Sequence, residues 1–166
     1  ITPKEKRVVN KFVYDSVLFT IEGITGHARN EILELKKRGK EIYITDPNYN
    51  SLYEEEFKNM YVPFDWRKDA YITIVNQPPV RWNNTAHLRN RIGYLAFDGK
   101  LNKEWVKIIN ESNMIEIWTP SEYCKKMFIK SGVQKPVIVI PHGVDNKVFQ
   151  PKQIDQFDTF TFLAIG

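Results

Sequence analysis

A strand, a helix and a second strand occupy residues 114–140, and this alternation constrains the fold more than any other feature of the chain. "MIEIW" (114–118) is a short apolar strand, "TPSE" (119–122) is typical of a helix start, and "PVIVI" (136–140) is an unbroken apolar run. Such a run is typical of a parallel sheet that helices cover on both faces. The strand–helix–strand order predicts two parallel strands joined by a right-handed crossover.

The same alternation extends toward the N-terminus. Apolar runs predict strands at 16–23, 41–46, 70–75 and 91–97, and helical spacing predicts helices at 24–40 and 102–112 and a shorter one around 51–59. Asn102 is the expected N-cap of its helix, and Gly39 and Gly132 stand where helices end in a left-handed residue. Six strands with intervening helices predict an α/β fold: a Rossmann-like, doubly wound parallel sheet flanked by helices.

Residues 141–158 have the composition of a linker, with two prolines, one glycine and several polar residues. The following run, "TFTFLAIG" (159–166), reads as an apolar strand with no partner left in the chain, and the first residue is Ile1 rather than Met. We therefore expect a Rossmann-like domain at 1–140, an interdomain linker at 141–158, and at 159–166 the first strand of a truncated second α/β domain.

Composition narrows the class of protein. The chain of 166 residues is 42% apolar and 27% charged, which is ordinary for a soluble globular protein. One cysteine, Cys124, excludes an internal disulfide and is expected in the core. A net charge of +4 fits phosphate-bearing ligands or an anionic membrane face, but not a dedicated nucleic-acid binder. No His, Cys and carboxylate cluster has metal-ligand spacing, so no metal site is expected.

Two ordered stretches carry a family resemblance. "WTPSEYCKKMFIKSGV" followed by "VIVIPHGVDNKVFQP" resembles the segment that joins the two domains of retaining GT-B glycosyltransferases of family four (glycosyl transferases group 1), and "GYLAFDGKLNKEWVKIINESNMIEIW" (93–118) resembles the stretch before it. The resemblance implies the N-terminal, acceptor-side half of a GT-B fold. The family's Glu-(seven residues)-Glu element belongs to the C-terminal domain.

The implied reaction transfers a hexosyl group from a nucleotide-diphosphate sugar to the hydroxyl of a sugar or lipid-linked acceptor, with retention, in a cleft between two domains. It needs no metal and no cofactor besides the nucleotide sugar, and this fragment alone is expected to be inactive. The implied location is the cytoplasm, with peripheral contact at the cytoplasmic membrane face left open.

Three residues are candidates for a phosphate-binding loop. Gly23 and Gly26 bracket the predicted turn between the first strand and the first helix, where backbone N–H groups and the helix dipole favour an anion. The resemblance places the donor diphosphate near this loop; the alternative is a tight turn that simply needs glycine. His27 follows, and is expected either in the same crevice or exposed on the helix.

Asp98 is the candidate catalytic carboxylate, because it is predicted at the carboxyl end of the fourth strand, where it could orient an acceptor hydroxyl or take its proton. The alternative is a turn residue in Asp98-Gly99. Ser121 and Glu122 are expected in a helix cap, with Thr119 as the N-cap residue and Ser121 at the cleft edge. His142 is expected in the linker, as a structural or hinge residue.

Tyr61 and Trp66 lie in an aromatic-rich stretch (49–66) and are candidates for stacking on a sugar acceptor, the alternative being core packing.

Two other functions stay open. A nicotinamide-dependent oxidoreductase is disfavoured because "GITGHA" lacks the Gly-x-Gly-x-x-Gly pattern, although Asp46 supplies the acidic residue after the second strand. A non-catalytic carbohydrate- or nucleotide-binding domain would share the fold.

Overall fold

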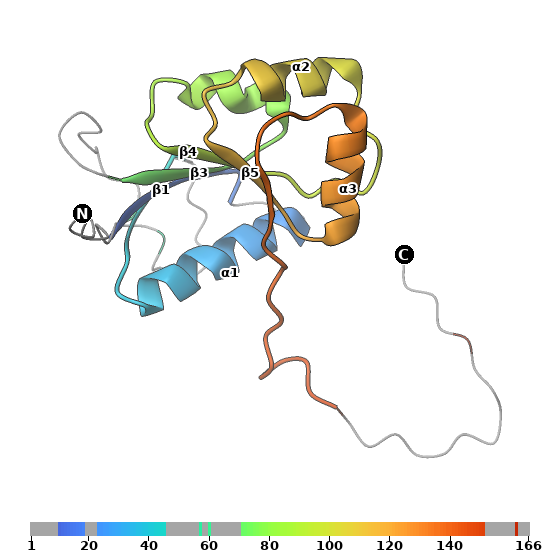
Figure 1. The fold of residues 1–166 in the computed structure, drawn as a ribbon. Coiled ribbons are helices and arrows are strands. Elements are labelled where there is room, and N and C mark those ends of the chain that lie inside the picture. The colour runs from blue at the N-terminus through green and yellow to red at the C-terminus, as the bar shows by residue number, and fades with distance from the viewer. Residues whose placement is uncertain are drawn as a thin grey trace, which may run out of the picture.

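The fold is a parallel sheet with helices on both faces (Figure 1). The computed structural model describes residues 10–18, 23–45, 57, 60, 71–151 and 162, with side chains from residue 25 onward in the second range. The strands are β1 (Lys11–Ser16), β2 (Glu41–Ile44), β3 (Ile72–Asn76), β4 (Arg91–Tyr94), β5 (Glu116–Thr119) and β6 (Val137–Val139). The helices are α1 (Gly23–Lys37), the 3₁₀ helix η2 (Pro79–Thr85), α2 (Lys103–Glu111) and α3 (Glu122–Ser131).

The strand order in this sheet is β2-β1-β3-β4-β5-β6, and every pair is parallel. The chain adds β2 on one side of β1 and then adds β3 to β6 on the other side. The direction of winding therefore reverses between β1 and β3, and in open α/β sheets ligands bind at the carboxyl ends of the strands beside such a reversal. The predicted α/β Rossmann-like fold with six parallel strands is confirmed.

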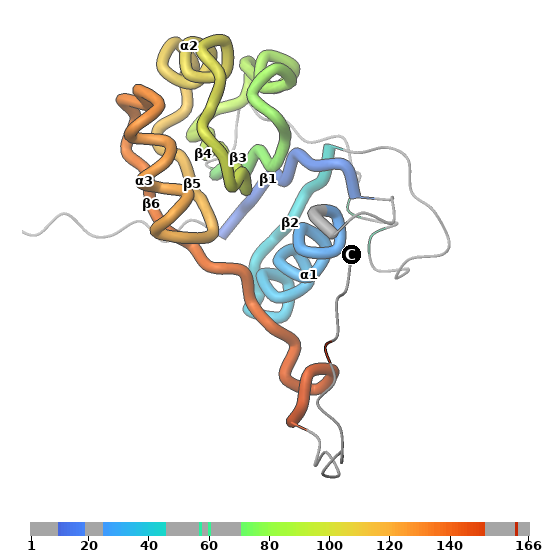
Figure 2. The backbone as a smooth tube through the Cα atoms, turned by 90° about the vertical axis from the view of Figure 1, so that its right-hand side faces the viewer, coloured from blue at the N-terminus to red at the C-terminus, as the bar shows by residue number. Residues whose placement is uncertain are grey.

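The two faces of the sheet have separate cores. On one face α1 contributes Ala28 and Ile32 to a cluster with Tyr14, Ile74 and Tyr94. The other face carries α2, α3 and η2, as Figures 1 and 2 show. Because successive side chains of a strand point to opposite faces of the sheet, β3 contributes Ile74 to the first core and Val75 to the second.

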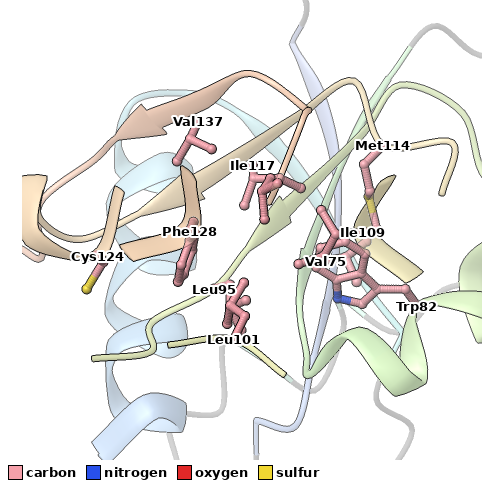
Figure 3. Close-up of a cluster of buried hydrophobic side chains, with 11 residues drawn as sticks. Val75, Trp82, Leu95, Leu101, Ile109, Met114, Ile117, Cys124, Phe128 and Val137 are labelled. Carbon is pink, nitrogen blue, oxygen red and sulfur yellow. The ribbon is translucent and has the colours of Figure 1, made fainter. Parts of the chain in front are cut away.

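The second core includes Trp82 of η2, which lies over the sheet among Val75, Ile109 and Met114 (Figure 3). Trp82 is fully buried, and its Nε1 donates to the carbonyl oxygen of Gln77 at 2.8 Å. A Cβ built on Gly93 of β4 would lie 2.6 Å from this indole ring. Glycine at position 93 therefore lets η2 approach the sheet closely.

Several predicted helix ends are confirmed. The Asn102 side chain accepts from the N–H of Trp105 at 2.7 Å and caps α2. Gly39 and Gly132 follow α1 and α3 with φ of +73° and +104°, in the left-handed region that glycine adopts without strain. Cys124 is buried in the second core, as expected.

The predicted first strand at 16–23 is wrong, because β1 is Lys11–Ser16 and Gly23 already belongs to α1. The apolar run that suggested a strand lies after β1. The actual strand contains buried polar residues: Asp15 accepts a hydrogen bond from Thr45 Oγ1 at 2.6 Å, and Tyr14 donates to Glu31. Hydrogen bonding offsets the desolvation of these groups, so a buried strand need not be an apolar run.

The predicted start of α3 is also wrong by two residues. Thr119 is the last residue of β5, paired with Val139, and is fully buried. The N-cap is Ser121, whose Oγ accepts from the N–H of Cys124 at 3.1 Å. Glu122 is therefore the first helical residue rather than the third, and it does not close a capping box.

Residues 141–151 follow β6 as an exposed segment without helix or strand. In both backbone views the segment crosses α1 and then runs beyond it (Figures 1 and 2). The predicted helix around 51–59, apart from residue 57, and the strand at 159–166, apart from residue 162, lie outside the described residues.

Candidate functional site

Three aromatic rings from distant parts of the chain meet beside α1. The ring centroids of His27 on α1 and His142 after β6 are 3.9 Å apart, in a stacked arrangement. The ring of Tyr94, at the carboxyl end of β4, lies 5.3 Å from His27 and 5.9 Å from His142. Tyr94 Oη also donates to the carbonyl oxygen of Ile140 at 3.1 Å, so β4 holds the chain just before His142.

A chain of polar contacts continues from His27 under α1. His27 Nε2 is 3.7 Å from Glu31 Oε2, one helical turn later on the same face. The hydroxyl of Tyr14, on β1, donates to that same carboxyl oxygen. Tyr14 is completely buried, while the side chains of His27 and Glu31 are 16% and 20% exposed. The contacts therefore link α1 to the centre of the sheet.

Asn76 completes this arrangement at the carboxyl end of β3. The parallel register pairs Ser16 with Asn76, which puts the Asn76 side chain on the α1 face of the sheet near the Tyr14 hydroxyl. Asn76 is 4% exposed, and its side chain is placed to hydrogen-bond the Tyr14 hydroxyl and oppose the rise of the Tyr14 pKa, although the contact lies outside normal hydrogen-bond geometry; His27 Nε2 makes no hydrogen bond. We call the set Tyr14, His27, Glu31, Asn76, Tyr94 and His142 the polar cluster.

Burial keeps the ionisable members of the polar cluster toward their neutral forms. Burial, with a contribution from His142, lowers the pKa of His27 to about 4, and burial also lowers the pKa of His142. Burial raises the pKa of Glu31, although the hydrogen bond from Tyr14 opposes this shift. The pKa values of Tyr14 and Tyr94 are raised, mainly by burial and then by the nearby Glu31 carboxyl.

At neutral pH the polar cluster therefore presents uncharged imidazoles and phenols, an amide and one carboxyl group. Such groups donate and accept hydrogen bonds without carrying positive charge. The arrangement suits hydroxyl groups, which both donate and accept, and it lies next to the reversal point between β1 and β3.

The structure brings together two of the residues that the sequence singled out, His27 and His142, which the sequence treated separately. Gly23 and Gly26 do not bracket a strand-to-helix turn as predicted, since both lie in the first turn of α1. β1 ends at Ser16 and α1 begins at Gly23, so neither glycine lies between the two elements. Their backbone N–H groups are still among those that a helix start leaves without an intrahelical partner.

The remaining predicted site residues lie elsewhere. β4 ends at Tyr94 instead of residue 97, so Asp98 is an exposed loop residue four positions past the strand. Glu122 is exposed in the first turn of α3, where a carboxylate favours the helix dipole, and Ser121 serves as the cap. Tyr61 and Trp66 lie outside the described residues.

Sequence reasoning missed Tyr14, Glu31, Asn76 and Tyr94. The one available signal was the i, i+4 spacing of His27 and Glu31, which puts both side chains on one face of a helix. Tyr14, Asn76 and Tyr94 lie within or at the end of strands. Strands are predicted from their apolar residues, and this pattern does not single out the polar residues among them.

Comparison with protein-family models, with curated proteins and with solved structures finds no match for this chain. The fold itself defines the class: an α/β domain with a Rossmann-like parallel sheet and a polar cluster at its carboxyl edge. Among the described residues, no helix is long and apolar enough to cross a membrane. The same part of the chain contains no group of three or more His, Cys, Asp or Glu side chains placed to hold a metal ion.

Proposed function

We propose that this chain is the N-terminal, acceptor-side part of a retaining GT-B glycosyltransferase. In that role it transfers a hexosyl group from a nucleotide-diphosphate sugar to the hydroxyl of a sugar or lipid-linked acceptor, together with a C-terminal donor-binding domain. The reaction needs no metal ion and no resident cofactor. Nucleic acid is not a partner, and the enzyme works in the cytoplasm or at the cytoplasmic face of a membrane.

The observation that carries the proposal is the polar cluster at the carboxyl edge, reached by the segment that resembles the interdomain connection of this family. His142 belongs to that segment and stacks on His27. Under this proposal the segment leads to a second domain. Because it also lines a hydroxyl-compatible site, that site would lie in the cleft between the two domains.

The residues take different roles under this proposal. The polar cluster orients the acceptor hydroxyl, which is a positioning role worth several orders of magnitude in rate for well-aligned reactants. Asp98 remains the proposed catalytic carboxylate, and the first turn of α1 with Gly23 and Gly26 remains the proposed approach for the donor phosphates. Tyr61 and Trp66 remain the proposed acceptor-stacking residues.

The test uses the complete gene product that contains these residues. It is incubated with a panel of nucleoside-diphosphate hexoses and candidate acceptors, and release of the nucleoside diphosphate and configuration of the product are measured. We expect transfer with retention by the complete protein and none by the 166-residue chain alone. Nucleotide or carbohydrate binding without any turnover would instead support the non-catalytic binding domain.

Three variants assign the roles. Asp98→Asn is expected to lower kcat by about 10²- to 10⁴-fold, the usual contribution of an acid–base group. His27→Ala is expected to raise the KM for the acceptor about 10-fold or more with little effect on the donor. Glu104→Gln, an exposed carboxylate on α2, serves as the control and should retain full activity. Equal kinetics for Asp98→Asn and the unmodified enzyme would remove Asp98 from catalysis.

A further inference from the structure

The segment that follows β6 contacts α1 through a pair of stacked rings. His142 stacks on His27 with ring centroids 3.9 Å apart, and Figures 1 and 2 show the segment 141–151 crossing this helix. Just before it, Tyr94 Oη donates to the carbonyl oxygen of Ile140 at 3.1 Å, which anchors the chain at the end of β6. The two imidazoles therefore stand where the chain passes from an anchored strand to an exposed segment.

Beyond His142 the segment buries little surface. Within the part of the chain that the structure describes, its hydrogen bonds are internal and join Asp145 to the N–H groups of 147–149. Its large apolar side chains are exposed: Val144 by 66%, Val148 by 71% and Phe149 by 70%. Segments with few buried contacts detach at a small cost in free energy. The position of this segment therefore depends strongly on the contact between the two rings.

We propose that His27 and His142 form an acid-sensitive contact, which holds residues 141–151 against α1 at neutral pH and releases them as the pH falls from about 6.5 toward 5. The stacked arrangement favours uncharged rings. Two imidazolium ions at this separation repel each other, and a charged ring within the contact loses part of its hydration. Release takes one of the three rings away from the polar cluster. The inference concerns this chain alone and does not depend on the proposed sugar transfer.

The other groups that face the two rings stay in place when the segment leaves. Glu31 of α1 lies 3.7 Å from His27 Nε2, and Tyr14 of β1 donates to Glu31. The ring of Tyr94, on β4, lies beside both imidazoles. These three residues belong to the sheet and its covering helix, so their effect on His27 is similar in the docked and released states. The change on release is the loss of the stacked partner and the exposure of both imidazoles to water.

The nearest charges of the segment and of α1 act in the opposite direction. The pKa of Glu34 is lowered by its hydrogen bond to Lys37 and by the charge of Lys37, and Asp145 of the segment opposes that shift. Asp145 and Glu34 therefore repel each other when both are ionised, which disfavours docking at neutral pH. Carboxyl groups ordinarily take up protons near pH 4. Their titration would strengthen docking in acid, whereas titration of the imidazoles weakens it.

The direction of the pH dependence agrees with the imidazole pKa values. Burial, and then His142, lowers the pKa of His27 to about 4, and burial lowers the pKa of His142. A released imidazole in water has a pKa of about 6.5. The docked state is therefore fully favoured above about pH 6.5, and docking weakens as the pH falls toward the docked pKa values. The shift at His27 corresponds to a rise of up to about 30-fold in the ratio of released to docked protein between pH 7.5 and 5.

The experiment follows the position of the segment in the 166-residue chain by NMR between pH 7.5 and 5. The readout is the nuclear Overhauser effect between the ring of residue 142 and the ring of Tyr94, whose centroids are 5.9 Å apart when the segment is docked. We expect this signal at pH 7.5 and its progressive loss on acidification, while near-ultraviolet circular dichroism shows that the domain stays folded. A signal that persists unchanged at pH 5, or one that is absent at pH 7.5, would overturn the proposal. Unfolding of the whole domain in this range would also overturn it, because release would then not be a local event.

Phenylalanine tests the role of charge because its ring can stack but cannot be protonated. In the double variant His27→Phe/His142→Phe we expect the ring signal to persist at pH 5, with a change of less than about threefold in the ratio of released to docked protein. His142→Phe alone alters only the exposed segment and should show a smaller pH response than the unmodified protein, which keeps the test available if the double variant does not fold.

His87→Phe changes the third histidine of the chain, at an exposed position outside the polar cluster, and is the matched control. It should release the segment over the same pH range as the unmodified protein. Acid release that is the same in the His142→Phe variant as in the unmodified protein would assign the effect to another group and refute the proposal. Loss of the response in the His87→Phe control would refute it as well.

Discussion

Replacing Gly93 by alanine should destabilise the protein through one defined clash. The new Cβ would lie 2.6 and 2.7 Å from two carbon atoms of the Trp82 ring and 3.3 Å from Cδ1 of Ile117. Separations below 3.0 Å require movement, and the fully buried indole is anchored by its hydrogen bond to the Gln77 carbonyl. Overpacking of this kind typically costs about 1–3 kcal/mol.

The free energy of unfolding is measured by urea titration with tryptophan fluorescence, and the melting temperature by circular dichroism. For a chain of this size about 1 kcal/mol corresponds to roughly 2–4 °C, so the expected decrease in melting temperature is roughly 2–12 °C. Gly26→Ala is the matched control, since the nearest atom to its new Cβ is 3.8 Å away and the position is helical. That control should be stabilised by about 0.5–1 kcal/mol.

A double substitution tests the cause. Trp82→Phe removes part of the ring that Gly93→Ala would meet, so the double variant should be less destabilised than the sum of the two single variants. Strict additivity, or a Gly93→Ala protein as stable as the unmodified one, would show that η2 can shift away from the sheet. The close approach of η2 to β4 would then not explain the glycine.

Three other predictions follow from the structure. The neutral His27 stabilises the fold fully above its ordinary pKa of about 6.5, and this stability is lost as pH falls toward its folded pKa of about 4. In urea titrations from pH 7 to 4, the free energy of unfolding of the His27→Gln variant should therefore fall by up to about 3 kcal/mol less than that of the unmodified protein. If the two proteins lost the same free energy of unfolding over this pH range, the lowered pKa of His27 would be contradicted. Arg91→Met should lower the free energy of unfolding by about 3–5 kcal/mol, because the Trp82 carbonyl, Thr85 Oγ1 and Asn113 Oδ1 lose a buried donor. Arg81→Met, at an exposed position, is the control and should change the free energy of unfolding by less than about 0.5 kcal/mol. EDTA should leave sugar transfer by the complete enzyme unchanged, and activity restored by added Mg²⁺ or Mn²⁺ would refute the metal-independent mechanism.

The alternation of apolar strands and amphipathic helices was sufficient to predict the sheet and its parallel direction. Helix ends were predictable where one residue type has a strong local preference, as at Asn102 and Gly132. Strand ends were less predictable, because they depend on pairing. Thr119 is favourable as a helix cap in isolation, but its pairing with Val139 keeps it in β5.

The candidate site could be predicted only in fragments. His27 was identified from its place near a helix start and His142 from its place after the last strand, but their stacking depends on where β6 leaves the sheet. Glu31 carries no sign in the sequence that it faces Tyr14, because the contact depends on how α1 packs across β1. Asn76 became notable only when the structure placed its buried amide beside the Tyr14 hydroxyl.

The distribution of charge separates two tasks within the proposed enzyme. The chain carries a net charge of +4, yet the polar cluster next to the reversal point contains uncharged imidazoles, phenols, an amide and the Glu31 carboxyl group. A nucleoside diphosphate carries negative charge that must be offset where it binds, and the polar cluster does not offer that compensation. Groups that offset this charge must therefore come from outside the polar cluster, either from the backbone N–H groups at the start of α1 or from the proposed donor-binding domain. A polar cluster without cationic side chains and a separate site that offsets the phosphate charge is the division of tasks that we propose for transfer from a diphosphate sugar to a hydroxyl.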